Sequence, residues 1–164
     1  MGELRIRVAE ARDLDAINAI YNHCVERSTC TFQVEPVSAA ERASWFAEHG
    51  EAHPVTVAER EGEVVGWGAL SPHKGRCAYR HTVEPSVYVH QDLLGQGIGR
   101  ALLGDLIARA RAVGHHTMVG GVCSENAASL ALCREFGFLE VGHLREVGRK
   151  FERWLDVVLV QLQL

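Results

Sequence analysis

Residues 84–113 read EPSVYVHQDLLGQGIGRALLGDLIARARAV and combine three local patterns. The first is an apolar, strand-like piece from Val87 to Val89. A cluster of three glycines follows within residues 95–99, and apolar side chains then recur at helical spacing from Leu102 to Ala110. The stretch therefore predicts a strand, a glycine-rich loop and a helix, in that order.

The glycine-rich loop at the start of the predicted helix suits an anion. The first N–H groups of a helix have no partner within the helix and carry the positive end of its dipole, so phosphates bind there readily. Glycines let the backbone approach a ligand and reach dihedral angles that a Cβ would forbid. We therefore predict a ring of amides around a pyrophosphate, formed by Gly95, Gln96, Gly97, Ile98, Gly99 and Arg100.

Two common phosphate motifs do not fit this loop. A dinucleotide fingerprint beginning at Gly95 needs a glycine where Arg100 stands, and one beginning at Gly97 needs it where Leu102 stands. A P-loop needs the tripeptide Gly-Lys-Ser/Thr, which the sequence lacks. NAD and ATP are therefore poor candidates for the ligand.

The loop resembles the coenzyme A loop of the GNAT acetyltransferases. That family's pattern, Gln/Arg-x-x-Gly-x-Gly/Ala, is matched by residues 94–99, which read LGQGIG. Leu94 departs from the polar first position, but main-chain donors do not depend on that side chain. The resemblance implies acetyl-coenzyme A (acetyl-CoA) as the cosubstrate.

Further short matches resemble the phosphinothricin and methionine sulfoximine N-acetyltransferases within that family. They cover nearly the whole chain, and their order and spacing together carry the resemblance. They are Thr31-Phe32, Arg76-Cys77-Ala78-Tyr79, Thr82-Val83-Glu84, Val87-Tyr88-Val89, Asn126, and the ending from Gly148 to Val157. The resemblance implies an enzyme that acetylates the α-amine of a small glutamate-like amino acid, by direct attack of the amine on the thioester in a ternary complex.

Length and composition narrow the class of protein. At 164 residues the chain is long enough for one domain with a full core, and we predict a single domain over residues 1–164. With a net charge of −4, the protein lacks the positive electrostatic field that non-specific nucleic-acid binding requires. The charged N-terminus, MGELRIRVAEARD, lacks an apolar signal core, and no stretch approaches the ~18 apolar residues of a membrane span. We expect neither a nucleic-acid nor a membrane partner.

Cysteine and histidine usage adds two expectations. The five cysteines form neither CxxC pairs nor an even disulfide set, which is typical of reduced thiols in a cytoplasmic protein. The nine histidines show no HxxxH or His/Cys spacing on one helix face, so we predict no metal.

The remaining pattern predicts the element order βααβββαβαββ. Asp13 is expected to cap the first helix, and Ser38 with Glu41 forms a capping-box signature for the second. The order predicts a mixed α/β (α+β) sheet with helices on both faces. The resemblance implies a GNAT-like, mostly antiparallel sheet of about seven strands, in which the strands bearing Val87 and Met118 splay apart around the pantetheine arm. A turn is predicted at Glu61-Gly62, a loop over Arg145–Arg153, and a helix over Asn126–Glu135 that stops at Gly137. The predicted strands are Arg5–Val8, Val55–Arg60, Val64–Leu70, Thr82–Val89, Met118–Cys123, Val141–Leu144 and Leu155–Leu162.

Glu84 is the candidate general base, because the substrate ammonium must lose a proton before its nitrogen can attack. A positioned base contributes ~10²–10⁴-fold, here through a water molecule. The alternative is an exposed strand carboxylate. Pro85 marks an edge or a bulge, and a bulge beside Glu84 would turn one backbone N–H toward the thioester oxygen. Otherwise Pro85 simply begins the strand one residue later.

Five further residues are candidates for contact with acetyl-CoA or its leaving group. We expect the backbone of Val87, Tyr88 and Val89 to pair with the pantetheine amides as another strand would. Asn126 is either a helix cap, a cofactor contact or both. Cys133 stands where most of the resembled family carries a tyrosine that acts as general acid, so it is either a proton donor to the leaving thiolate or an inert, buried hydrophobe.

Substrate recognition is expected at Phe32 and at the run Arg76, Cys77, Ala78 and Tyr79. A guanidinium can hold a carboxylate through two hydrogen bonds, and an aromatic wall can pack on an aliphatic stem. The alternatives are solvated arginines and ordinary core aromatics. The resemblance also implies a homodimer. Two other functions stay open: acetylation of a different amine (a polyamine, an antibiotic or a protein N-terminus), or a non-catalytic acetyl-CoA-binding module.

Overall fold

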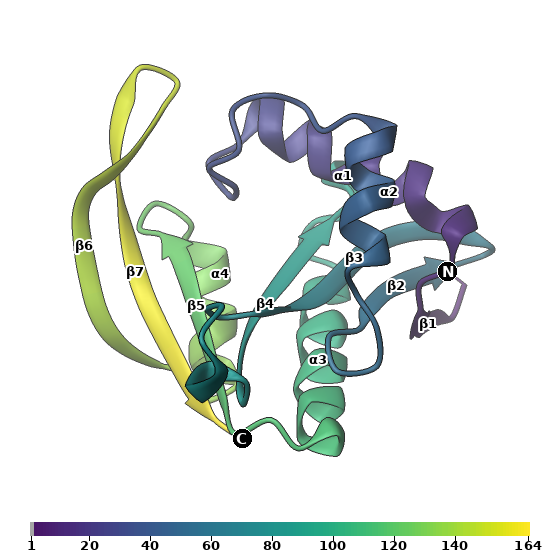
Figure 1. The fold of residues 1–164 in the computed structure, drawn as a ribbon. Coiled ribbons are helices and arrows are strands. Elements are labelled where there is room, and N and C mark those ends of the chain that lie inside the picture. The colour runs from purple at the N-terminus through teal and green to yellow at the C-terminus, as the bar shows by residue number, and fades with distance from the viewer. Residues whose placement is uncertain (1) are drawn as a thin grey trace.

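The chain is built on one seven-stranded sheet, described for residues 2–164 in a computed structural model (Figure 1). The strands follow the order β1-β2-β3-β4-β5-β7-β6, and every neighbouring pair is antiparallel except β4 and β5. The predicted mixed, mostly antiparallel sheet is confirmed. The strands are β1 (Leu4–Val8), β2 (Val55–Arg60), β3 (Glu63–Pro72), β4 (Thr82–Val89), β5 (Thr117–Cys123), β6 (Leu139–Lys150) and β7 (Arg153–Gln163).

Helices cover both faces of the sheet, as predicted (Figure 1). On one face, α1 and α2 pack over Trp67, and on the other α3 packs against β3 so closely that a Cβ on Gly66 would lie 3.0 Å from Ile98 Cγ2. Helix α4 lies beside α3, sharing its apolar core. The helices are α1 (Leu14–Arg27), α2 (Ala39–Ala47), α3 (Ile98–Val113) and α4 (Ala127–Glu135), with short 3-10 turns η1 (Ala11–Asp13), η2 (Cys77–Tyr79) and η3 (Gln91–Leu93).

The sheet opens between β4 and β5. These parallel strands pair only at Thr82 with Thr117 and at Val83 with Met118. Beyond these pairs β4 continues beside β3 and β5 continues beside β7, so the two strands diverge (Figure 1). This is the splay that the resemblance implied, and it creates a wedge in the middle of the sheet.

Local signals in the sequence set several element boundaries. Ser38 Oγ accepts a hydrogen bond from Glu41 N (3.2 Å) and the Glu41 carboxylate accepts one from Ser38 N (2.8 Å), which confirms the capping box. Glu61 and Gly62 both adopt positive φ (53° and 84°), as a tight hairpin turn requires. Gly137 ends α4 with a φ of 86°.

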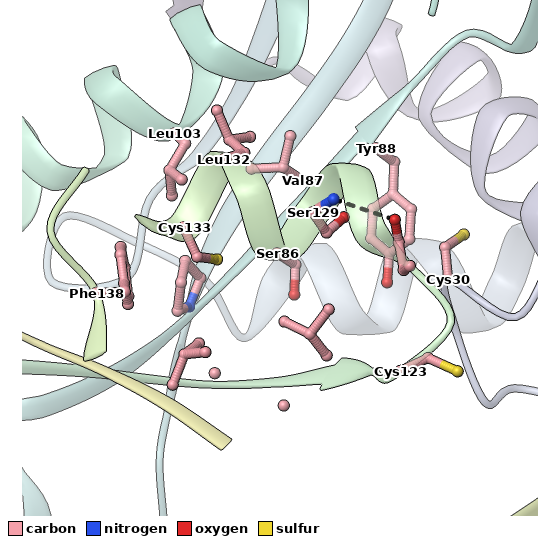
Figure 2. Close-up of a pocket in the computed structure, with 16 residues that line it drawn as sticks. Cys30, Ser86, Val87, Tyr88, Leu103, Cys123, Ser129, Leu132, Cys133 and Phe138 are labelled. Carbon is pink, nitrogen blue, oxygen red and sulfur yellow. Dashed lines mark hydrogen bonds between the residues drawn. The ribbon is translucent and has the colours of Figure 1, made fainter. Parts of the chain in front are cut away.

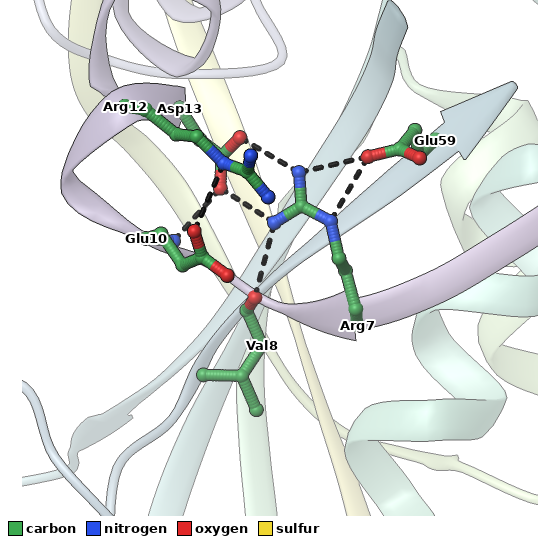
Figure 3. Close-up of polar contacts among 6 residues, drawn as sticks. All are labelled: Arg7, Val8, Glu10, Arg12, Asp13 and Glu59. Carbon is green, nitrogen blue, oxygen red and sulfur yellow. Dashed lines mark hydrogen bonds and ion pairs between the residues drawn. The ribbon is translucent and has the colours of Figure 1, made fainter. Parts of the chain in front are cut away.

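Asp13 precedes α1 but does not cap it, so that prediction is wrong (Figure 3). Its backbone is already helical (φ −87°, ψ −10°), and its carboxylate accepts hydrogen bonds from Arg7 Nη1 (2.7 Å), Arg7 Nη2 (2.8 Å) and Glu10 N (2.7 Å). Arg7 also contacts Glu59, with its Nη2 2.9 Å from Glu59 Oε2. A charged, bidentate donor binds a carboxylate more strongly than a helix amide does, so the side chain turns toward Arg7.

The last two strands are longer than predicted. β6 runs on to Lys150 and β7 begins at Arg153, so the predicted loop Arg145–Arg153 is instead a hairpin with a two-residue turn. The turn residues Phe151 and Glu152 take positive φ (50° and 60°), which is uncommon outside glycine. The pairing of β6 with β7 is interrupted by a bulge between Leu144 and Gly148, where Glu146 has a φ of 51°.

Candidate functional site

A pocket lies in the wedge between β4 and β5 (Figure 2). One wall is the second half of β4 and the opposite wall is β5, while α4 closes the back. The lining includes Pro85–Tyr88 of β4, Gly120–Cys123 of β5, Asn126 with Ser129, Leu132 and Cys133 of α4, and Cys30 from the loop after α1.

The backbone of β4 has one paired side and one free side. His90 N donates to Val65 O (2.9 Å), and Leu70 N of β3 donates away from β4 to Pro54 O (3.0 Å). With the antiparallel alternation of hydrogen bonds, the even-numbered residues of β4 therefore bond to β3. The N–H and C=O groups of Val87 and Val89 point into the wedge, where β5 has already diverged.

Pro85 fits into this strand without a bulge. The pairing of β3 and β4 keeps one register from Val83 opposite Pro72 to Val89 opposite Gly66, so the predicted bulge beside Glu84 is wrong. Because residue 85 has its nitrogen on the wedge side, the missing N–H of proline costs no hydrogen bond to β3. The first N–H of β4 that faces the wedge after Pro85 belongs to Val87.

The side chains of β4 alternate between the two faces. Val87 and Val89 pack toward α3, where a Cβ on Gly99 would lie 3.6 Å from Val89 Cγ2. Tyr88 points to the other face and stacks on Trp67 with ring centroids 4.8 Å apart. Burial raises the pKa of Tyr88, so its hydroxyl stays protonated. The side chains of Val87 and Val89 are thus partly buried against α3, while their backbone groups face the wedge.

The glycine loop lies directly before α3 and has the backbone conformation that the sequence predicted. Gly95 and Gly97 take positive φ (76° and 80°), and α3 begins immediately afterwards at Ile98. The first helical bond runs from Ala101 N to Gly97 O (3.0 Å). Within residues 2–164, none of the six amide N–H groups from Gly95 to Arg100 donates to another protein atom.

Two side chains of the loop are tied to neighbouring elements. Gln96 Oε1 accepts a hydrogen bond from Arg60 Nη1 of β2 (2.8 Å), and Arg100 forms an ion pair with Glu135 of α4. These contacts hold the loop in place and leave its amides pointing outward. The donors can therefore meet a diphosphate with little rearrangement, because their geometry is set before the ligand binds.

Glu84 lies next to a histidine that the sequence analysis missed. His73 Nδ1 is 2.7 Å from Glu84 Oε1, and the Glu84 side chain is 45% exposed. The His73 ring meets the Tyr79 ring edge-on, with centroids 5.7 Å apart. The pairing of β3 with β4 places residue 73 diagonally across from residue 84, which is the signal that could have revealed the contact. Tyr79, His73 and Glu84 thus form a connected group near the wedge.

Cys133 lines the pocket (Figure 2), and so does Asn126. Burial raises the pKa of the Cys133 thiol, which therefore keeps its proton at neutral pH and remains able to donate it. Asn126 Oδ1 accepts a hydrogen bond from Ser129 N (3.1 Å) and so caps α4, which confirms the cap interpretation. The amide nitrogen of Asn126 is left for another partner.

The predicted substrate residues fall into two groups. Cys77, Ala78 and Tyr79 form the exposed turn η2 between β3 and β4, with Arg76 directly before it. Of these four residues, Tyr79 contacts His73 of the His73–Glu84 pair. Phe32 lies apart from them, with its ring pressed against Gly148 of β6, where any Cβ would overlap it. The structure therefore places Tyr79 against His73, which contacts Glu84, and Phe32 joins the loop after α1 to the β6–β7 hairpin.

Two negative findings complete the description of residues 2–164. No three His, Cys, Asp or Glu side chains in this range converge in a way that could hold a metal ion. No helix in it has the length and apolar character needed to cross a bilayer.

Comparison with known proteins gives a consistent set of relatives. A model described as the acetyltransferase (GNAT) family matches residues 16–138. The L-amino acid N-acyltransferase MnaT of Escherichia coli (strain K12) is 43% identical, over 98% of this chain and 94% of its own. The L-methionine sulfoximine/L-methionine sulfone acetyltransferase of Salmonella typhimurium is 41% identical, over 98% of this chain and 95% of its own. A phosphinothricin acetyltransferase from Sinorhizobium meliloti, solved in complex with AcCoA, has a TM-score of 0.95 and 37% identity, covering 98% of this chain and 88% of that one.

Proposed function

Because this chain belongs to the acetyltransferase (GNAT) family, we propose that it is an acetyl-CoA-dependent N-acetyltransferase for a small glutamate-like amino acid. Phosphinothricin, methionine sulfoximine and methionine sulfone are the substrates that its relatives suggest. The single observation that carries the proposal is the row of unpaired backbone donors that runs from Gly95–Arg100 to the wedge side of β4. A row of main-chain donors can bind a diphosphate at the helix start and the amides of an attached arm along the strand.

The residues present fit acetyl-CoA. The amides of Gly95–Arg100 would hold the diphosphate, and the wedge-facing backbone of Val87 and Val89 would bind the pantetheine amides as an added strand. Asn126 would contribute its side-chain amide from the start of α4. When bound, acetyl-CoA supplies the acetyl group as a thioester.

Glu84 is the proposed general base. Its carboxylate would take the proton of the substrate ammonium through a water molecule, since it is partly exposed and directly precedes the pocket-lining Pro85. His73 positions that carboxylate through its 2.7 Å contact. The neutral amine then attacks the carbonyl directly, within a ternary complex.

Two other groups would act on the acyl transfer. The Val87 N–H faces the wedge without a partner, so it can stabilise negative charge that develops on a carbonyl oxygen there. The protonated Cys133 thiol lies on the same pocket wall and would return a proton to the leaving thiolate.

Amine recognition is proposed at the η2 turn and at Phe32. Arg76 is exposed, has no ion pair within residues 2–164, and can grip a substrate carboxylate in a bidentate manner. Tyr79 and Phe32 would supply aromatic walls, and the backbone of Cys77 and Ala78 completes the turn. The assignment of the turn rests on the contact of Tyr79 with His73, which pairs with Glu84, and that of Phe32 rests on the family resemblance.

We also propose a cytoplasmic homodimer. The five cysteines are all free thiols, which suits a reducing compartment. The last hairpin exposes a row of large apolar side chains, with Trp154 60% and Leu139 70% exposed, together with Val141, Leu144, Val147 and Phe151. Patches of this kind are typical of protein interfaces. Sedimentation of the protein as a monomer at micromolar concentration would count against the dimer.

The enzyme is tested by measuring thiol release from acetyl-CoA across a panel of amines. We expect turnover with methionine sulfoximine, methionine sulfone or phosphinothricin, and a roughly 10²–10⁴-fold loss of kcat/KM in Glu84→Gln. Glu63→Gln is the matched control, because Glu63 is an exposed strand carboxylate at the far end of β3.

Other outcomes would redirect the proposal. Turnover of only a polyamine, an antibiotic or a peptide N-terminus would change the substrate class. Tight acetyl-CoA binding with no turnover of any amine would favour a non-catalytic binding module. Full activity in Glu84→Gln would remove Glu84 as the base.

A further inference from the structure

One guanidinium beside the glycine loop has no acidic partner. Arg60 is the last residue of β2, and its Nη1 donates a hydrogen bond to Oε1 of Gln96, in the middle of the loop (2.8 Å). Glu63 lies opposite Arg60 in the pairing of β2 with β3, yet within residues 2–164 Arg60 forms an ion pair with neither Glu63 nor any other carboxylate. The neighbouring Glu59 is bound by Arg7 instead. Arg60 therefore brings an uncompensated positive charge to the loop.

Most of the hydrogen-bonding capacity of Arg60 is unused. A guanidinium carries five N–H donors, and the contact with Gln96 uses one of them. The Nε atom is buried and has no hydrogen-bond partner in the described part of the chain. Because a buried polar group without a partner costs free energy, the side chain is stabilised if it moves to an acceptor that can take more than one of its donors.

The position of this charge matters because α3 begins at the same place. The start of α3 carries the positive end of the helix dipole, and the amides of Gly95–Arg100 donate to no other atom of residues 2–164. The dipole and the Arg60 guanidinium repel each other, and both attract an anion. The other guanidinium at the loop, that of Arg100, is already paired with Glu135. Arg60 is therefore the cation at this loop that remains for a ligand.

The sequence of the loop gives a second, independent reason. Leu94 stands where the GNAT pattern has Gln or Arg, and it is 66% exposed. The loop thus lacks a polar side chain at its first position. Arg60 supplies a charged side chain to the same loop from a neighbouring strand, although it lies 36 residues before Gln96 in the chain.

We propose that Arg60 is a binding residue for the diphosphate of coenzyme A, and that its guanidinium leaves Gln96 for phosphate oxygens when the ligand is bound. The proposal rests on the proposed function, which places the diphosphate at Gly95–Arg100. A phosphate oxygen is the better acceptor, because charge-assisted hydrogen bonds are roughly twice as strong as neutral ones and a guanidinium can hold a phosphate through two donors. In the free protein, the hydrogen bond to Gln96 keeps Arg60 close to the loop.

The test is isothermal titration calorimetry with coenzyme A, which measures binding without turnover. Arg60→Gln should raise Kd about tenfold, which is the lower end of the range for a hydrogen bond to a charged group, because Arg60 is partly exposed. Arg60→Lys keeps the charge but not the planar fork, so its Kd should lie between the two. The difference between wild type and Arg60→Gln should shrink at high salt, since salt screens exposed charges.

Arg5→Gln is the matched control, because it removes the same charge from the adjacent strand β1. Leu4 and Ile6 of β1 pack with Ile98 and Leu102 of α3, so the alternation of side chains directs Arg5 to the opposite face of the sheet. Its Kd for coenzyme A should equal that of wild type.

Two further measurements separate phosphate binding from other roles. Dephospho-coenzyme A lacks the 3′-phosphate but keeps the diphosphate, so Arg60→Gln should weaken its binding by the same factor. Without ligand, Arg60→Gln should be at least as stable to urea as wild type, because the substitution removes an unpaired charge beside the positive end of α3.

Each failure has a separate meaning. Wild-type affinity in Arg60→Gln and in a second variant, Arg60→Met, would overturn the role of Arg60 and leave cosubstrate binding intact. A loss with coenzyme A that disappears with dephospho-coenzyme A would overturn the diphosphate assignment. A marked loss of stability without ligand would mean that Arg60 only supports the loop. Failure of the wild type to bind coenzyme A would overturn the proposed function together with this proposal.

Discussion

Replacing Asp13 by asparagine should weaken the fold in a pH-dependent way. Asp13 is 4% exposed and Arg7 14% exposed, and the Asp13 carboxylate accepts two hydrogen bonds from that guanidinium and one from Glu10 N (Figure 3). Asparagine has nearly the same shape but no charge, and its nitrogen cannot accept a hydrogen bond. The substitution leaves the buried guanidinium with Glu59 as its one remaining carboxylate.

The expected cost is about 3 kcal/mol at pH 7, the lower end of the range for breaking a buried ion pair, because Glu59 still offsets part of the charge. That is roughly two powers of ten in the unfolding equilibrium constant. Arg7 lowers the pKa of Asp13 below its ordinary 3.8. A carboxyl whose pKa is lower in the folded state contributes stability above its unfolded pKa, and that stability is lost as the pH falls through the folded pKa.

Urea unfolding of both proteins at pH 7 and at steps below pH 4 measures this effect. The difference in unfolding free energy should be largest at neutral pH and should shrink in acid, while other carboxyls cancel in the comparison. Arg12→Ala is the matched control: Arg12 pairs with Glu10 at 2.9 Å, but both side chains are more than half exposed, so its loss should change little. A cost below about 1 kcal/mol for Asp13→Asn, or a cost that stays constant with pH, would refute the reasoning.

Three further substitutions test other parts of the structure. Gly97→Ala should raise KM for acetyl-CoA and lower the free energy of unfolding in urea by about 1–2 kcal/mol, because φ at residue 97 is +80° although there is room for the methyl group. Gly75→Ala is the control: that site is equally open but lacks a positive φ, so its stability should hardly change. Gly148→Ala should displace the Phe32 ring, so KM for the amine rises and stability falls by about 1–3 kcal/mol, whereas unchanged amine kinetics would remove Phe32 from the substrate site. Ser38→Ala should lower stability by about 1 kcal/mol in the same unfolding assay without changing kcat, and no loss would mean that the cap is dispensable.

Features that depend on a few neighbouring residues were predictable from the sequence. The capping box of α2 and the glycine-rich start of α3 each depend on side chains within one or two turns of chain. The order of strands and helices was also predictable, because hydrophobic periodicity is a pattern among residues close together in the chain. Family resemblance added the splay of β4 from β5, which no local pattern contains.

Features that depend on the choice of a distant partner were not predictable. Asp13 looked like a helix cap because the sequence does not show that Arg7 folds back onto it. Pro85 looked like a bulge because its free side becomes evident only once β5 is known to diverge. The His73–Glu84 contact depends in the same way on how β3 and β4 are aligned. Long-range register is therefore where the sequence analysis reached its limit.

The two residue pairs that join β4 to β5 also have a mechanical consequence. Within residues 2–164 they are the only strand pairing between the half of the sheet made of β1–β4 and the half made of β5–β7. Besides these pairs, the two halves share one apolar core, so a change in the width of the wedge would strain both the corner and that core. None of Thr82, Val83, Thr117 and Met118 lines the pocket. We therefore expect the rate at which a long, thin molecule leaves the cleft to depend partly on residues that it never touches.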